Sequence, residues 1–160
     1  MNPPAVRPAG DEEGSAVVEF VLVAVLVLVP LLYVVLAAFH VQRTSFAVTQ
    51  AAREAGRAFA TADDPATGEA RARYAVELAM ADHGLDRDGV AGRVADLRFV
   101  GIGEDCDGPL VSPTLEPGAR FAVCVIAQVR LPGVPEAFDA GHNTVTGRFV
   151  VRVEDVRSAP

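Results

Sequence analysis

The residue with the most unusual chemical setting is Glu19, which lies near the start of a long apolar segment. Between Ala16 and Phe39 the only other ionisable side chain is the phenol of Tyr33. A carboxylate at the centre of a bilayer costs about 2.5–3.5 kcal/mol, and less near the interface, where Glu19 would lie. One interpretation is that Glu19 reaches the lipid headgroups. The other is that it pairs with a cation of a neighbouring subunit, because a low dielectric strengthens such a pair.

The chain has two cysteines, Cys106 and Cys124, which form a candidate disulfide. Such a bridge typically contributes about 3 kcal/mol by restraining the unfolded chain. The alternative is a pair of buried thiols, since unpaired cysteine is often simply buried. Cys124 falls on the same face of a predicted strand as Arg120 and Gln128, which favours a bridge if the compartment is oxidising.

The other polar motifs predict no catalytic residue, metal or cofactor. His40, His83 and His142 are scattered and make no zinc site with the cysteines. The run Gly101–Gly103 lacks the third glycine of a dinucleotide site. The acidic run Glu104–Gly108 lacks the oxygen spacing of an EF-hand. No serine or cysteine has a histidine and a carboxylate nearby in the sequence, so we expect a protein that is not an enzyme.

The composition of the chain limits the kinds of partner and the size of domain that we expect. The net charge of −7 argues against nucleic acid, since phosphate binding needs a basic surface. All 14 basic residues are arginine, which indicates a GC-rich coding bias and so favours a bacterial source. With 160 residues there is room for a membrane segment and one modest domain.

The element that carries Glu19 is predicted to be a transmembrane helix over residues 15–40. About 20 apolar residues cross a hydrocarbon core, and the run from Ala16 to Phe39 is slightly longer. Pro30 should bend this helix because it removes a backbone donor. The alternative is a cleaved signal peptide, which needs a positive flank and a core of about 7–15 residues. The acidic flank Asp11–Glu13 and the long core favour a retained anchor.

We expect the helix to continue over residues 41–62, because apolar residues recur there on one helical face. That stripe consists of Val41, Val48, Ala52, Ala55 and Phe59. It either packs on the chain's own domain or pairs with the helix of a partner.

Residues 63–157 are predicted to form an α+β domain. Asp64 and Pro65 suit the start of a second helix, which is predicted to run from about Ala66 to Asp82 and to be stopped by His83 and Gly84. Its inward residues would be Ala72, Ala75, Val76 and Ala79.

From Val94 onward the apolar period changes to two, which predicts an antiparallel sheet of about three strands with one solvent-exposed face. The inward residues would be Ala95, Leu97 and Phe99 in the first strand, Phe121, Val123, Val125, Ala127, Val129 and Leu131 in the second, and Val145, Phe149, Val151 and Val153 in the third.

The sequence Glu13-Gly14-Ser15-Ala16-Val17-Val18-Glu19-Phe20 resembles a class III prepilin processing site. The resemblance implies that a prepilin peptidase cuts between Gly14 and Ser15, so that residues 1–14 are a leader and Glu19 becomes the fifth mature residue. Glycine before the cut leaves the backbone accessible. The new amine at Ser15 would lie about one helical turn from Glu19. The glutamate of one subunit would then neutralise the amine of its neighbour, and Phe20 would share this assembly contact.

A second stretch, Gln50-Ala51-Ala52-Arg53-Glu54-Ala55-Gly56-Arg57-Ala58, is similar to the "AAREAAR"-like segment of the TadE/TadG family. These are pseudopilin-like membrane proteins of tight-adherence (Flp-type) pilus systems. The resemblance implies a pilin-like fold and a helix interface formed by Ala51, Ala52, Arg53, Ala55 and Arg57. The chain departs from the family in its acidic leader and at Gly56, where alanine is usual; glycine there should weaken the helix by about 1 kcal/mol.

The resemblance implies a minor pseudopilin-like component or assembly factor of a tight-adherence pilus or related secretion system. Its partners would be the membrane, other pilin-like subunits and the assembly machinery. The N-terminus would be cytoplasmic and the domain extracytoplasmic, although the arginine count, with Arg7 before the helix and Arg43, Arg53 and Arg57 after it, favours the opposite. The alternatives are an unprocessed, membrane-anchored envelope protein that binds a partner or ligand, and a regulator whose domain faces the cytoplasm.

Overall fold

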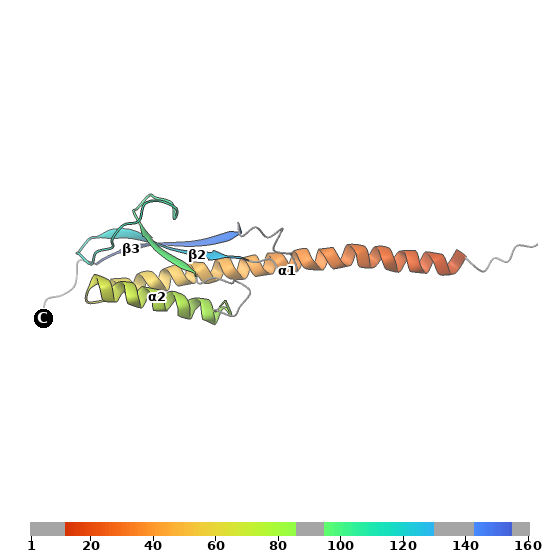
Figure 1. The fold of residues 1–160 in the computed structure, drawn as a ribbon, viewed down its shortest axis with the longest axis horizontal. Helices are drawn as coiled ribbons and strands as arrows, with labels where there is room; N and C mark the ends of the chain where they lie inside the picture. Colours follow the sequence, from red (N-terminus) through yellow and green to blue (C-terminus); the bar gives the residue numbers. More distant parts are fainter. Residues whose placement is uncertain (1–11, 86–94, 130–142, 155–160) are drawn as a thin grey trace, which may run out of the picture. The chain divides into compact units, whose positions relative to one another are not determined.

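The computed structural model describes residues 12–85, 95–129 and 143–154. The chain forms two compact units that divide between Ala38 and Phe39. Its elements, in chain order, are α1 (Glu12–Ala60), α2 (Pro65–Asp82), β1 (Asp96–Val100), β2 (Arg120–Gln128) and β3 (Thr144–Arg152) (Figure 1). The predicted α+β class, with two helices and a three-stranded antiparallel sheet, is confirmed.

The first helix begins before its predicted start and ends close to its predicted end. It begins at Glu12, before the predicted start at Ser15, and ends at Ala60. Pro30 lies inside it, and the helix continues on both sides of the proline. Residues 1–11 of the predicted leader lie outside the described residues. Residues 130–142, which include Leu131 and His142, lie outside them as well.

Capping explains where α2 begins. Asp64 has an extended backbone (φ −143°, ψ 160°), and its carboxylate accepts hydrogen bonds from the backbone N–H of Thr67 at 2.9 Å and from the Thr67 hydroxyl at 2.7 Å. Pro65 occupies the first turn, where the missing N–H costs no helical hydrogen bond. At the other end His83 caps the helix and Gly84 takes a positive φ of 63°. The predicted start and stop signals are therefore the ones that the fold uses.

The Asp64 cap gives the domain a specific acid dependence. The hydrogen bonds from the Thr67 hydroxyl and backbone N–H lower the pKa of Asp64 below its ordinary value of 3.8. Its ionised form therefore stabilises the domain above the ordinary pKa, and this stabilisation is lost as the pH falls through the folded pKa. We expect Asp64→Asn, which keeps the cap but cannot titrate, to flatten the acid limb of a plot of Tm against pH. Asp63→Asn should leave that limb unchanged; an identical flattening in both variants would contradict the assignment.

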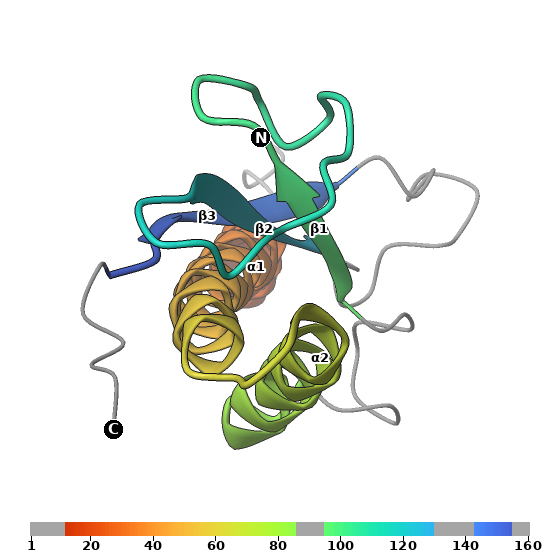
Figure 2. The same cartoon turned by 90° about the vertical axis from the view of Figure 1, so that its left-hand side faces the viewer.

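The part of α1 that belongs to the second unit, from Phe39 on, and α2 cover one face of the sheet (Figure 2). The strand order is β1-β2-β3, and the register places Phe99 opposite Val123 and Val123 opposite Phe149. Three rings from three elements meet in the core: the centroid of Phe59 is 5.3 Å from that of Phe99 and 5.2 Å from that of Phe121. The residues predicted to face inward in the second strand, from Phe121 to Val129, are all buried. The helix–sheet core therefore follows the predicted alternation.

Glycine permits a close approach between α1 and β3. A Cβ on Gly147 would lie 2.7 Å from the backbone nitrogen of Thr49 and closer still to the Val48 carbonyl. A Cβ on Gly56 would lie 2.7 Å from a methyl group of Val151. The prediction that Gly56 only weakens the helix is therefore wrong: this buried glycine makes room for β3.

The opposite face of the sheet is not simply solvent-exposed, which corrects the prediction of one fully wet side. The connector 101–119 folds over it, and Cys106 forms a disulfide with Cys124 of β2, with their Cα atoms 5.7 Å apart. A small cluster of buried residues results: Val100, Cys106, Ala122 and Cys124, with Ile126 packed against it. Period-two alternation could not reveal this cluster, because its cover comes from a connector with no periodicity of its own.

Candidate functional site

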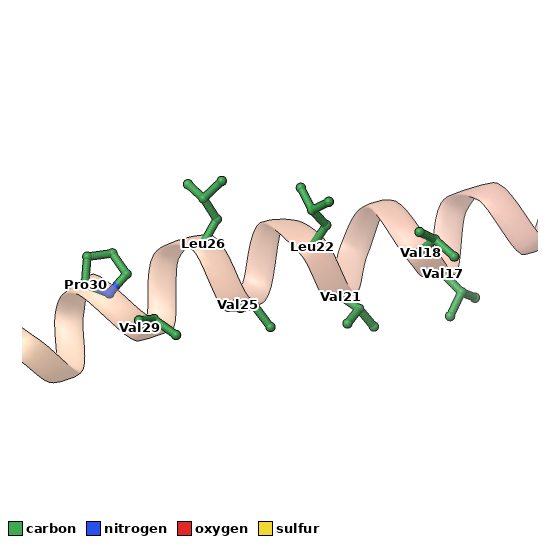
Figure 3. Close-up of a pocket in the computed structure, with 8 residues that line it drawn as sticks. All are labelled: Val17, Val18, Val21, Leu22, Val25, Leu26, Val29 and Pro30. Atoms are coloured by element: carbon green, nitrogen blue, oxygen red, sulfur yellow. The ribbon is translucent and has the colours of Figure 1, made fainter.

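The N-terminal part of α1 presents an apolar surface with nothing packed on it among the described residues. Every residue from Ala16 to Leu36 is exposed. The side chains from Val17 to Pro30 project from a single stretch of helix, and the groove that they line is open (Figure 3). One helix near the N-terminus is thus long and apolar enough to cross a membrane. Hydrocarbon would cover this apolar surface without leaving backbone groups unpaired, because the helix already pairs its own N–H and C=O groups.

Glu19 lies on this helix with its side chain exposed, next to Phe20, which is 75% exposed. In the described part of the chain no hydrogen bond or ion pair to the Glu19 carboxylate is present. Gly14 and Ser15 lie in the first turn of α1, which begins at Glu12. Ser15 and Glu19 are four residues apart, a rise of about 6 Å. In lipid, a cation near the first turn would neutralise this carboxylate.

The predicted helix interface divides into two sets that face different ways. Ala51, Ala52 and Ala55 are fully buried within the chain's own core. Arg53 and Arg57 are exposed, and the Arg57 guanidinium lies 4.0 Å from the Glu54 carboxylate. In this fold the alanines are therefore not available to another subunit, which corrects their assignment to a subunit interface. Their small side chains let α1 approach the sheet and α2 closely, and of the two predicted alternatives intramolecular packing is the one observed.

Polar contacts hold α2 against α1 beside the alanines. The guanidinium of Arg43 donates to the backbone carbonyl of His83, and the His83 Nε2 lies 3.1 Å from the Gln50 Oε1. These residues were not predicted as a group, because their interaction joins positions 33 to 40 residues apart. The contacts place His83 in a structural role at the end of α2.

Metal-binding groups and open grooves are the other kinds of site that the described ranges of the domain could hold. No group of three or more His, Cys, Asp and Glu residues there could hold a metal ion. One open groove lies between the end of α1 and α2, with Tyr74 and Leu78 exposed beside Arg71. Sequence reasoning missed it, although the spacing of Tyr74 and Leu78 on one helical face was the available signal.

Comparison with models of protein families, with curated proteins and with solved structures finds no match to this chain.

Proposed function

We propose that this chain is a minor pseudopilin-like component or assembly factor of a tight-adherence pilus or a related secretion system. The observation that carries the proposal is the exposed Glu19 carboxylate near the start of an exposed apolar helix, one turn after the Gly14–Ser15 bond. A solitary carboxylate on a lipid-facing helix is costly, so its retention favours a role in which another charge meets it.

The proposed chemistry is hydrolysis followed by charge pairing. A prepilin peptidase adds water across the amide between Gly14 and Ser15, which leaves a carboxylate on Gly14 and an ammonium group on Ser15. In an assembly, the ammonium of one subunit pairs with the Glu19 carboxylate of the next. The apolar residues around the pair exclude water, so the attraction is stronger there than at a wet surface.

The disulfide supports an extracytoplasmic domain. Bonds such as Cys106–Cys124 persist in oxidising compartments and are rare in the cytosol. The arginines that follow the membrane segment oppose this orientation, but a long domain translocates largely regardless of its charge. We therefore propose a single-pass protein in the cell membrane with a cytoplasmic N-terminus.

The Glu19 contact is tested with Glu19→Ala in cells that contain the pilus machinery. We expect the variant to be inserted and processed normally but to lose cross-linking to other pilin-like subunits by about a hundredfold, because removing one partner of a buried ion pair costs about 3 kcal/mol or more. The measurement is the yield of cross-linked subunits by mass spectrometry, together with the N-terminal residue of the mature chain, which should be Ser15.

Glu77→Ala is the matched control, since it removes an exposed carboxylate from α2, outside the membrane segment. It should cross-link as the unchanged chain does. A chain that still begins at Met1 in the presence of an active prepilin peptidase would contradict processing. A Glu19→Ala chain that assembles normally would contradict the charge pair and favour the unprocessed, membrane-anchored envelope protein.

A further inference from the structure

The outer edge of β3 is the open edge of the sheet. All nine residues of β3 pair one to one with β2, without a bulge. Within the described ranges no strand lies on the other side of β3. The opposite edge of the sheet is partly covered, because Leu110 forms a bridge with Val100 of β1 and the N–H of Val111 donates to the carbonyl of Phe99 at 2.9 Å. The two edges are therefore not equivalent.

The hydrogen bonds at the two ends of β3 identify which backbone groups face this open edge. The Asn143 carbonyl accepts from the N–H of Val129 at 2.7 Å, and the Val153 N–H donates to the carbonyl of Ala119 at 3.0 Å. Odd-numbered residues thus direct their backbone groups toward β2. In an antiparallel ladder the direction alternates, so the even-numbered residues from Thr144 to Arg152 direct their N–H and C=O groups away from it.

Two of the five side chains at the same even-numbered positions carry positive charge, and the others are Thr144, Thr146 and Val150. Arg148 and Arg152 project from the face of the sheet opposite the helices, with Arg120 of β2 directly across from Arg152. Arg148 is exposed and makes no ion pair with a described residue. The chain as a whole carries a net charge of −7, so this group of arginines is a local exception.

The helix face of β3 is apolar, and it is incompletely covered at this edge. Val145 and Phe149 pack against the core but are only partly buried. Arg53, three residues before Gly56, lies on the adjacent flank of α1 and is exposed. The edge therefore combines three outward-facing backbone positions with no bond to a described residue (Thr146, Arg148 and Val150), an apolar margin on one face and arginines nearby.

We propose that the open edge of β3 binds an extended segment of another protein in which apolar and acidic residues alternate. The segment adds as a fourth strand: its backbone pairs with Thr146, Arg148 and Val150, its acidic side chains meet Arg148, and its apolar side chains cover Val145 and Phe149. Pairing with the same edge of a second copy is disfavoured, since it would gather the arginines of both copies on one face. The proposal does not depend on processing at Gly14 or on Glu19.

The test uses the full-length chain, isotopically labelled and held in lipid nanodiscs, with two synthetic eight-residue peptides as probes. One peptide alternates valine with glutamate and the other alternates valine with lysine. We expect the glutamate peptide to slow amide hydrogen exchange at Thr146, Arg148 and Val150, and to bind at least about tenfold more tightly than the lysine peptide. Amides of the odd-numbered residues already bond to β2 and should change little.

Three variants separate strand addition from simple charge attraction. Val150→Pro removes one outward N–H without removing a bond to β2, a position where an edge strand tolerates proline, and it should abolish binding. Val150→Thr keeps the N–H and should bind as the unchanged chain does. Arg148→Glu should reverse the preference, so that the lysine peptide binds more tightly. If Val150→Pro fails to fold, the charge reversal decides the question by itself.

Several outcomes would overturn the proposal. They are binding of neither peptide, equal binding of both peptides, and an unchanged preference after Arg148→Glu. A well-folded Val150→Pro chain that binds like the unchanged one would do so as well. Vesicles of phosphatidylglycerol test the other anionic partner: if they bind the unchanged chain and Val150→Pro equally, and Arg148→Glu does not bind them, the arginines serve a lipid surface and no strand is added.

Discussion

Gly147→Ala is expected to lower the free energy of unfolding of the domain by about 3 kcal/mol, at the upper end of the usual cost of overpacking. The added methyl group would lie 2.7 Å from the Thr49 nitrogen and closer to the Val48 carbonyl carbon and oxygen. These atoms are backbone, and the Val48 side chain is fully buried, so neither rotation of a side chain nor displacement toward solvent relieves the collision. Pulse proteolysis of the full-length protein in detergent, over a series of urea concentrations, measures the loss.

Gly101→Ala and Gly56→Ala are the matched controls. A Cβ on Gly101 meets its nearest atom, the Glu104 Cγ, at 3.4 Å, an ordinary contact, so the stability should change little. A Cβ on Gly56 meets side-chain atoms of Val151 and Phe149, which can shift, and alanine strengthens the helix by about 1 kcal/mol. We expect the loss of stability to be largest for Gly147→Ala, smaller for Gly56→Ala and smallest for Gly101→Ala. A Gly147→Ala chain as stable as Gly101→Ala would contradict the close approach of α1 and β3.

Loss of the disulfide is expected to lower the free energy of unfolding of the domain by a similar amount, about 3 kcal/mol for a closed loop of this length. The bond joins residues that are 18 positions apart and holds the connector 101–119 over the outer face of β2. In the Cys106→Ser, Cys124→Ser double variant we expect the midpoint of urea unfolding to fall. We also expect proteases to cut first within the connector, because the cluster that anchors it loses its central bond.

Reductant provides the control, since the chain has only these two cysteines. Dithiothreitol should destabilise the unchanged chain and leave the double variant unaffected. An unchanged unfolding midpoint in both comparisons would show that packing of Val100 and Ala122 holds the connector without help from the bond.

Much of the fold was predictable because short segments carry their own signals. The apolar run that contains Glu19 predicts a membrane-length helix, and Asp64 with Pro65 predicts the start of α2 because a cap needs only the next three residues. The alternation around Phe121 predicts β2 and its inward face. Glu19 itself was visible as a carboxylate in an apolar run, but the charge that we propose it meets would belong to another molecule, and no sequence pattern within this chain identifies it.

By itself the sequence determined which segments are helices and strands and which face of each is apolar, since these follow from periods of two or about 3.6 residues and from capping within a few positions. Only the tertiary structure decided what covers each face. It placed Ala51, Ala52 and Ala55 against the chain's own sheet, Gly147 against the backbone of Val48, and the edge of β3 in the open. Such outcomes depend on the register and approach of elements about a hundred residues apart, on which local periodicity carries no information.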